Sequence, residues 1–275
     1  MFIQKIKITM NDFSNPKCYA NKLGNCSNKI SREHYISNNL LEKFEHNKTV
    51  KLSGLKWIRE ETFNLMSRNA LASNILCTKH NAELSPLDSE VGKLFQYLLD
   101  YDNDFNSQRP ANDRRIIQGD LIEKWMLKTV VGLIASKQIV DKSTNQSVKL
   151  KDMYVNILFN DLKFPQSWGM YFKVPDSNTI YKFDFLSVLP LIGNSEIKLT
   201  EFLINNFKFN LVLGNPDDPT FWGFYRINEI IFSQNTIQKV IEFLWNEGNQ
   251  GKSINLIRTG TTKNFPFEWE DWMKK

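Results

Sequence analysis

The sequence lacks a hydrophobic segment long enough to cross a membrane. No apolar run approaches the roughly 20 residues that a transmembrane helix needs. The first residues, MFIQKIKITMNDF, do not resemble a secretory signal, because lysines interrupt their apolar residues. We therefore expect a cytoplasmic protein without a membrane partner. In that compartment thiols stay reduced, so clustered cysteines indicate a metal site more than a disulfide.

Familiar cofactor and nucleophile motifs are also missing from the second half of the chain. It contains no recognisable phosphate-binding glycine loop, GxGxxG, kinase motif or Ser-His-Asp arrangement. The composition is nevertheless that of a folded protein, with 275 residues of which 41% are hydrophobic and 13% aromatic. A net charge of +5 is compatible with nucleic-acid binding, but ordinary soluble proteins often carry such a charge.

Cysteine and histidine are scarce, with three of each, and five of these six residues fall in two short segments. The first segment contains Cys18, Cys26 and His34, and the second contains Cys77 and His80. Cys-x2-His is a spacing at which a tight turn aims two side chains at one ion. Cys18 and Cys26 would complete a tetrahedral Cys3His zinc site.

Two other interpretations of the cysteines remain open. Cys18 and Cys26 could form a disulfide, although Cys77 would then be unpaired and a reducing compartment argues against it. All three could instead be small buried hydrophobes, since free cysteine packs well inside proteins. The loop of seven residues between Cys18 and Cys26 is longer than the two to four residues of most zinc knuckles. We favour zinc because the cysteines cluster with a histidine.

The order of these residues resembles that of the HNH nucleases, the ββα-metal superfamily, in their zinc-stapled form. Glu33 and His34 form an acid-His pair, and Asn81 directly follows the last residue of the second knuckle. The resemblance covers about residues 15–98. It implies that His34 is the general base and that Glu33 and Asn81 bind a catalytic Mg²⁺ or Mn²⁺. It also implies that the four cysteine and histidine ligands hold a structural Zn²⁺.

The chemistry of phosphodiester hydrolysis suits these residue types. The attacking water must lose a proton, and the neutral imidazole of His34 can take it at cellular pH. A hard cation such as Mg²⁺ accepts a carboxylate and an amide oxygen, here from Glu33 and Asn81, and completes its shell with water and phosphate. We therefore expect a metal-dependent endonuclease whose partner is DNA. Nicking, double-strand cutting and a role in bacterial anti-phage defence all remain open.

Some features depart from the family pattern. Between His34 and Cys77 lie 42 residues, and Asn69 and Asn74 are both open as the middle Asn of the motif. A typical member has cysteine where His80 stands, so His80 could bind the catalytic ion and leave a three-cysteine zinc site. The alternative function is a non-catalytic zinc-stapled module that binds nucleic acid or protein.

Helical spacing of apolar residues follows the second knuckle. It predicts a helix of about 14 residues from Ser85, in which Asp88 is a first-turn residue and not a metal ligand. A second long helix is expected over 114–138, where Trp125 belongs to the packed face more readily than to a base-stacking surface. His46 has no such context and is expected at the surface.

After about residue 150 the runs are short, aromatic and β-branched, which predicts antiparallel strands, with a helix over 236–248. The sequence thus predicts an α+β protein with an N-terminal zinc-stapled ββα-metal domain over 1–100. A linker and helical segment would occupy 101–145. A mainly antiparallel β-rich domain of unknown role would occupy 146–275, with a protein partner as one use of its surface.

Overall fold

The computed structural model describes residues 13–54, 64–107, 111–141, 146–173, 181–182, 185–204, 207–214, 217–248, 251–257 and 263–264. Over these residues the protein is a mixed α+β fold whose strands pair mostly antiparallel, as the sequence predicts. The α-helices are α1 (Asn38–Phe44), α2 (Thr78–Glu83), α3 (Ser85–Phe105), α4 (Gly119–Ala135) and α5 (Asp152–Phe159). Short 3-10 helices span Asn21–Leu23, Arg68–Leu71 and Pro219–Trp222. No helix of the described ranges is both long and apolar enough to cross a membrane.

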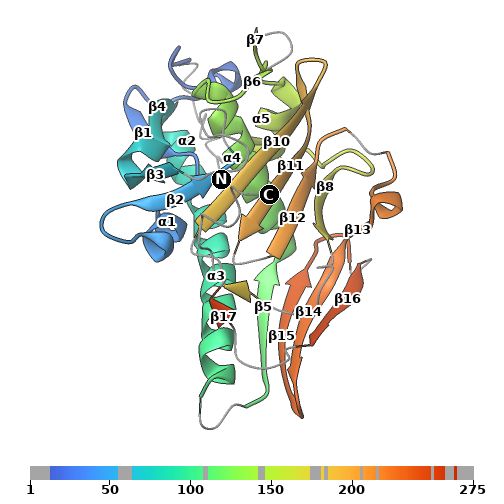
Figure 1. Ribbon diagram of the computed structural model, residues 1–275. Helices are drawn as coiled ribbons and strands as arrows, with labels where there is room; N and C mark the ends of the chain where they lie inside the picture. The colour runs from blue at the N-terminus through green and yellow to red at the C-terminus, as the bar shows by residue number, and fades with distance from the viewer. Residues whose placement is uncertain are drawn as a thin grey trace, which may run out of the picture.

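A small two-stranded sheet holds the N-terminal segments together. Strand β1 (Ile30–His34) pairs antiparallel with β4 (Ala72–Cys77), and α2 begins at the residue after β4. Helix α1 and strands β2 (Val50–Ser53) and β3 (Asn64–Met66) lie between β1 and β4 in the chain. The pairing of β1 with β4 places the two metal-ligand segments, which are distant in sequence, side by side (Figure 1).

The largest sheet has the strand order β13-β8-β12-β11-β10-β2-β3. Its β2 pairs parallel with β10, so the sheet joins an N-terminal strand to strands of the second half. The strands not yet located are β8 (Gly169–Lys173), β10 (Phe185–Gly193), β11 (Glu196–Ile204), β12 (Phe207–Val212) and β13 (Phe224–Tyr225). Four short strands form two further pairs: β6 (Val140–Asp141) with β7 (Gln146–Ser147), and β9 (Tyr181–Lys182) with β17 (Lys263–Asn264).

A four-stranded sheet with the order β16-β14-β15-β5 lies below the large sheet in Figure 1. Its strands are β5 (Asp113–Gln118), β14 (Ile227–Gln234), β15 (Ile237–Leu244) and β16 (Lys252–Ile257). Strand β5 pairs parallel with β15, so a segment from the middle of the chain completes a sheet of the C-terminal segments.

Helix α4 connects these layers. It contacts α3 and α5 as well as strands of both large sheets, and it lies behind the large sheet in Figure 1. Because apolar neighbours surround it, most of the helix is buried. Trp125 is among its buried residues, which confirms the prediction that it belongs to the packed face. Among the described residues the larger of two hydrophobic clusters runs from the cysteine segments to β16.

The structure corrects several element predictions. Residues 114–118 are part of β5 and do not start a helix, and 237–244 form strand β15 where a helix was predicted. Strands β5 and β15 pair with each other. Val240, Ile241 and Phe243 of β15 are buried. Long-range pairing therefore overrides local apolar spacing that also fits a helix.

Helix α3 is also longer than expected, with 21 residues against the predicted length of about 14. Its polar last turns stay helical because Tyr101 and Phe105 are buried. The sheets join segments on both sides of the predicted boundaries at 100 and 145. The division into 1–100, 101–145 and 146–275 stays a prediction.

Candidate metal centre

The four predicted metal ligands come from two segments that the β1–β4 pair brings together. Cys18 and Cys26 flank the first 3-10 helix, while Cys77 ends β4 and His80 lies in α2. Helix α2 begins at Thr78, directly after Cys77, so one sharp strand-to-helix transition turns both ligands of the second segment to the same side. We call these four residues the Cys3His group.

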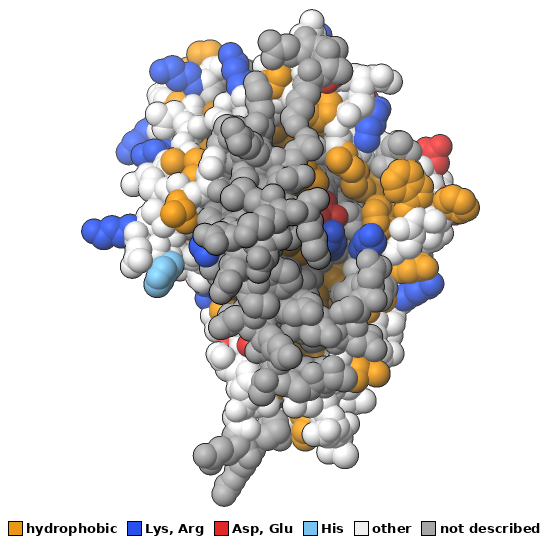
Figure 2. Space-filling model, in the orientation of Figure 1, with side chains coloured by type: hydrophobic (Ala, Val, Ile, Leu, Met, Phe, Trp, Pro, Cys, Tyr) orange, Lys and Arg blue, Asp and Glu red, His pale blue; other side chains and the backbone are white. Residues whose placement is uncertain are grey.

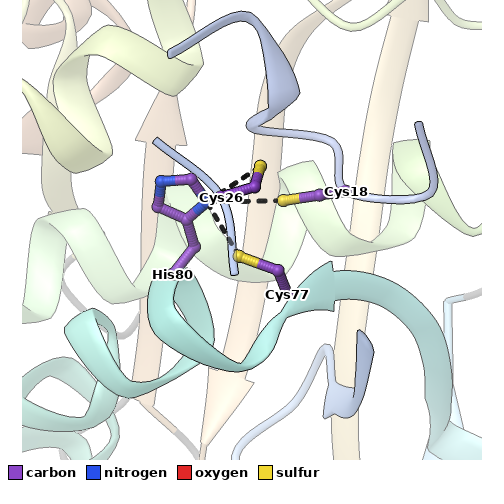
Figure 3. A group of neighbouring side chains, drawn as sticks. All are labelled: Cys18, Cys26, Cys77 and His80. Carbon is purple, nitrogen blue, oxygen red and sulfur yellow. Dashed lines mark hydrogen bonds between the residues drawn. The ribbon is translucent and has the colours of Figure 1, made fainter. Parts of the chain in front are cut away.

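The donor atoms of the Cys3His group have the spacing of a tetrahedral metal site (Figure 3). The distances from His80 Nδ1 to the Sγ atoms of Cys18, Cys26 and Cys77 are 3.4, 3.8 and 3.3 Å. Metal bonds of about 2.3 Å to sulfur and about 2.0 Å to nitrogen, at the tetrahedral angle, require about 3.5 Å between the sulfur and nitrogen atoms. All four residues are buried, and all three cysteines are free thiols. The group can hold a metal ion such as zinc, and the disulfide interpretation is wrong.

Asn25 orients the imidazole of His80. Its Oδ1 atom lies 2.7 Å from His80 Nε2, so Nε2 carries the proton and donates it to the amide oxygen. The Nδ1 lone pair then faces the three sulfur atoms. A hydrogen bond to the distal nitrogen of a ligand histidine is a usual feature of metal sites. Asn25 was not predicted as a site residue, although its position directly before Cys26 was a signal for it.

The thiols differ in how readily they lose a proton. Burial raises the pKa of Cys18 to about 12. Burial also acts to raise the pKa of Cys77, but backbone N–H groups of His80 and Ser27 outweigh it, so the pKa of Cys77 is lowered. The Ser27 nitrogen lies 3.4 Å from the Cys77 sulfur. A bound cation would favour the thiolate form of both.

The acid-His pair lies on β1, at the opposite end of the strand from Ile30, the residue that pairs with Cys77. His34 is the last residue of β1 and pairs with Ala72 of β4. Asn81 lies in α2, and its Nδ2 donates a hydrogen bond of 2.7 Å to Ser31 Oγ of β1. The structure thus brings α2 onto the strand that carries Glu33 and His34.

Glu33 makes a buried ion pair that the sequence analysis did not anticipate. Its Oε1 lies 2.7 Å from Nζ of Lys128 in α4, and the same Nζ lies 2.6 Å from Asp88 Oδ1. Burial raises the pKa of Glu33, and the Lys128 charge opposes this rise. Ser37 donates a hydrogen bond to Asp88 and accepts one of 2.6 Å from the Trp125 indole. Asp88 therefore belongs to a structural network, as the sequence analysis expected of it.

Lys128 was missed because it lies within an apolar run of α4. Its side chain is only 1% exposed, which is unusual for an ammonium group unless acids pair with it. The signal in the sequence was a single lysine within an otherwise apolar run.

His34 is held in its neutral form. Burial lowers its pKa, and the positive charges of Lys128, Arg32 and Arg68 lower it further. Its Nε2 atom is buried and has no hydrogen-bond partner among the described residues. A neutral ring nitrogen without a partner retains the capacity to accept a proton.

Within the described part of the chain, the other candidates make no contact that assigns them to these groups. Asn69 and Asn74 are both exposed, and the structure does not favour either as the middle Asn of the motif. His46 is exposed next to a short bridge with Thr49, as the sequence analysis expected.

A scan against protein-family models finds no matching family, and searches of curated proteins and of solved structures find no match either. The candidate site therefore rests on the chain's own residues.

Proposed function

We propose that the protein is a metal-dependent HNH endonuclease that hydrolyses DNA phosphodiester bonds. The observation that supports it is the arrangement of β1, β4 and α2, with an acid-His pair at the end of β1 and the Cys3His group at the junction of β4 and α2. Zinc in the Cys3His group would fix the helix that carries Asn81 against the strand that carries Glu33 and His34.

Each residue of the acid-His site has a role in this proposal. His34 takes the proton of the attacking water, and its lowered pKa keeps the ring neutral for that step. Glu33 and Asn81 would hold a divalent cation, Mg²⁺ or Mn²⁺, which would supply charge stabilisation at the phosphate. Lys and Arg side chains occur at several separate places on the face drawn in Figure 2, so contacts to phosphate would be distributed.

A second function is a non-catalytic zinc-stapled module that binds nucleic acid or protein. The observation that favours it is the burial of Glu33 against Lys128, since this carboxylate must leave an ion pair before it can bind a cation. An intact ion pair during DNA binding would leave the site without its carboxylate ligand.

Cleavage of supercoiled plasmid with Mg²⁺ or Mn²⁺ tests the proposal. We expect the parent protein to nick or linearise the plasmid and His34→Ala to lose this activity while it retains fold and zinc. His46→Ala is the matched control because His46 is exposed and outside the site. Equal cleavage by His34→Ala and the parent would rule out the HNH mechanism. Salt-sensitive binding without any cleavage would favour the second function.

A further inference from the structure

A second candidate site lies at the start of α4, separate from the Cys3His group. It is a cavity of about 740 Å³ enclosed by the first turns of α4, by residues 161–168 and by residues 245–248. Small-molecule sites in proteins have volumes of roughly 300–1,000 Å³. The cavity is therefore large enough for a ligand of the size of a nucleotide.

A buried carboxylate lines the cavity. Glu123 is 4% exposed, and its Oε1 accepts hydrogen bonds of 2.6 Å from the Met170 backbone N–H and from Arg226 Nη1. The backbone at Gly169 has φ +113°, and a Cβ atom there would lie 1.9 Å from Oε1. Only glycine permits this approach. Among the described residues no donor bonds Oε2, which leaves this oxygen for a ligand.

Arg226 offers hydrogen-bond donors next to that acceptor. Its guanidinium carbon lies 4.7 Å from the centre of the Trp245 ring, and its Nη2 donates a bond of 3.3 Å to the Trp168 carbonyl. A guanidinium has five N–H groups, and oxygens of Glu123, Trp168 and Tyr171 accept three of them among the described residues. In the ionised form of Glu123 the cavity thus presents an acceptor, Oε2, beside the remaining donors of Arg226; because burial raises the pKa of Glu123 to about 7, this form predominates above pH 7.

The walls and the rim have complementary chemistry. Aromatic side chains line the cavity: Phe164, Trp168, Tyr171 and Trp245. Two lysines also line it and make exposed ion pairs, Lys124 with Asp161 and Lys163 with Glu247. Asp161 and Glu247 have side-chain exposures of 97% and 66%. Exposed pairs of this kind contribute little, so either ammonium can turn to an incoming phosphate.

We propose that this cavity binds a nucleobase that presents an N–H beside a carbonyl group, as guanine, thymine and uracil do. The base N–H donates to Glu123 Oε2, and the neighbouring carbonyl accepts from Arg226. The flat ring lies among the aromatic side chains, and a phosphate of the same nucleotide meets the lysines at the rim. The base can belong to a free nucleotide or to an unpaired nucleotide of a single strand.

Titration calorimetry with uridine monophosphate, and with the same nucleotide methylated at N3, tests the base contact without changing the protein. Methylation removes the N–H and leaves a buried acceptor unpaired, so we expect affinity to fall about tenfold to a hundredfold. Oligothymidylate and a matched abasic oligonucleotide separate the two sources. Tighter binding of oligothymidylate than of the mononucleotide assigns the site to an unpaired nucleotide of a strand, and the reverse order assigns it to a free nucleotide.

Glu123→Gln is the protein variant for the same test. Glutamine can keep both hydrogen bonds to Oε1, but it puts an NH₂ donor where Oε2 accepted, so uridine monophosphate should bind at least tenfold more weakly. Glu242→Gln is the matched control, since Glu242 also pairs with an arginine, Arg114, at 2.7 Å but outside the cavity. Equal affinity for the two nucleotides, or no binding of any of these probes, would overturn the proposal. Neither result bears on plasmid cleavage.

Discussion

Replacing Lys128 by methionine tests the buried ion-pair network between α4 and the acid-His strand. Methionine keeps an unbranched apolar side chain of similar length, so the change removes mainly the charge. The Lys128 Nζ lies 2.7 Å from Glu33 Oε1 and 2.6 Å from Asp88 Oδ1. Its removal leaves two carboxylates facing each other without a counter-charge.

The cost follows from the burial of each partner. Removing one member of a buried ion pair costs about 3–5 kcal/mol, because the other charge stays buried and unpaired. This applies to Glu33, whose side chain is 5% exposed, whereas Asp88 at 29% remains partly hydrated and adds less. At pH 7 we expect the Tm of Lys128→Met to be on the order of 10 °C lower than that of the parent.

The loss should depend on pH with a defined sign. The pKa of Glu33 is already raised by burial, and losing the Lys128 charge raises it further. A carboxyl group whose pKa is raised in the folded state lowers the free energy of unfolding at pH values above that pKa. This effect disappears below the ordinary carboxyl pKa of about 4.3. The difference in Tm between variant and parent should therefore narrow as the pH falls from 8 to 5.

Calorimetry at several pH values measures both effects. Lys124→Met is the matched control, because Lys124 lies on the same helix but pairs with an exposed Asp161 and should change Tm little. A Lys128→Met protein within about 1 kcal/mol of the parent at pH 7 would refute the argument from burial. A Tm difference that stays constant with pH would refute the role assigned to Glu33.

Three further changes probe the Cys3His group and the cavity at α4. Elemental analysis should find one zinc in the parent and none in Cys77→Ser, which should also unfold at a lower temperature because metal binding and folding are coupled. Parent protein without zinc would contradict this. Asn25→Ala should weaken zinc affinity roughly 10- to 100-fold in a chelator competition, since His80 loses its hydrogen bond; unchanged affinity would show that Asn25 does not orient the ring. Burial raises the pKa of Glu123 to about 7, so its ionisation lowers the free energy of unfolding as the pH rises from 4.5 to 7. Glu123→Gln should remove this loss, which is on the order of 3 kcal/mol and can be measured by denaturant titration at several pH values. A variant with the same pH profile as the parent would refute the role assigned to Glu123.

The sequence by itself determined the composition of the metal centre. Cysteine and histidine are chemically distinctive and rare in this chain, and Cys77 and His80 lie at a spacing that one turn converts into a shared direction. Cys18 and Cys26 were then the remaining soft ligands. The same logic placed Asp88 in a structural role, because a first-turn acid after a proline has a local explanation. A site can be predicted from the sequence when only a few residue types can supply its chemistry.

Strand identity was decided by tertiary structure at β5 and β15. Their apolar residues fit helical spacing as well as alternation, and only pairing of Asp113–Gln118 with Ile237–Leu244 settles the conformation. The pairing of β2 with β10 is equally invisible in the sequence. Contacts between distant segments depend on which surfaces are left to cover, and local periodicity does not contain that information.

The environments of ionisable groups were also decided only by the fold. Glu33 looked like a free ligand in the sequence, yet Lys128 of a distant helix neutralises it in the core. Glu123 looked like an ordinary helix residue, yet Arg226 and the backbone at Met170 bury it beside a cavity. A charge changes its pKa and its availability through neighbours within a few ångströms, and the tertiary structure alone selects those neighbours.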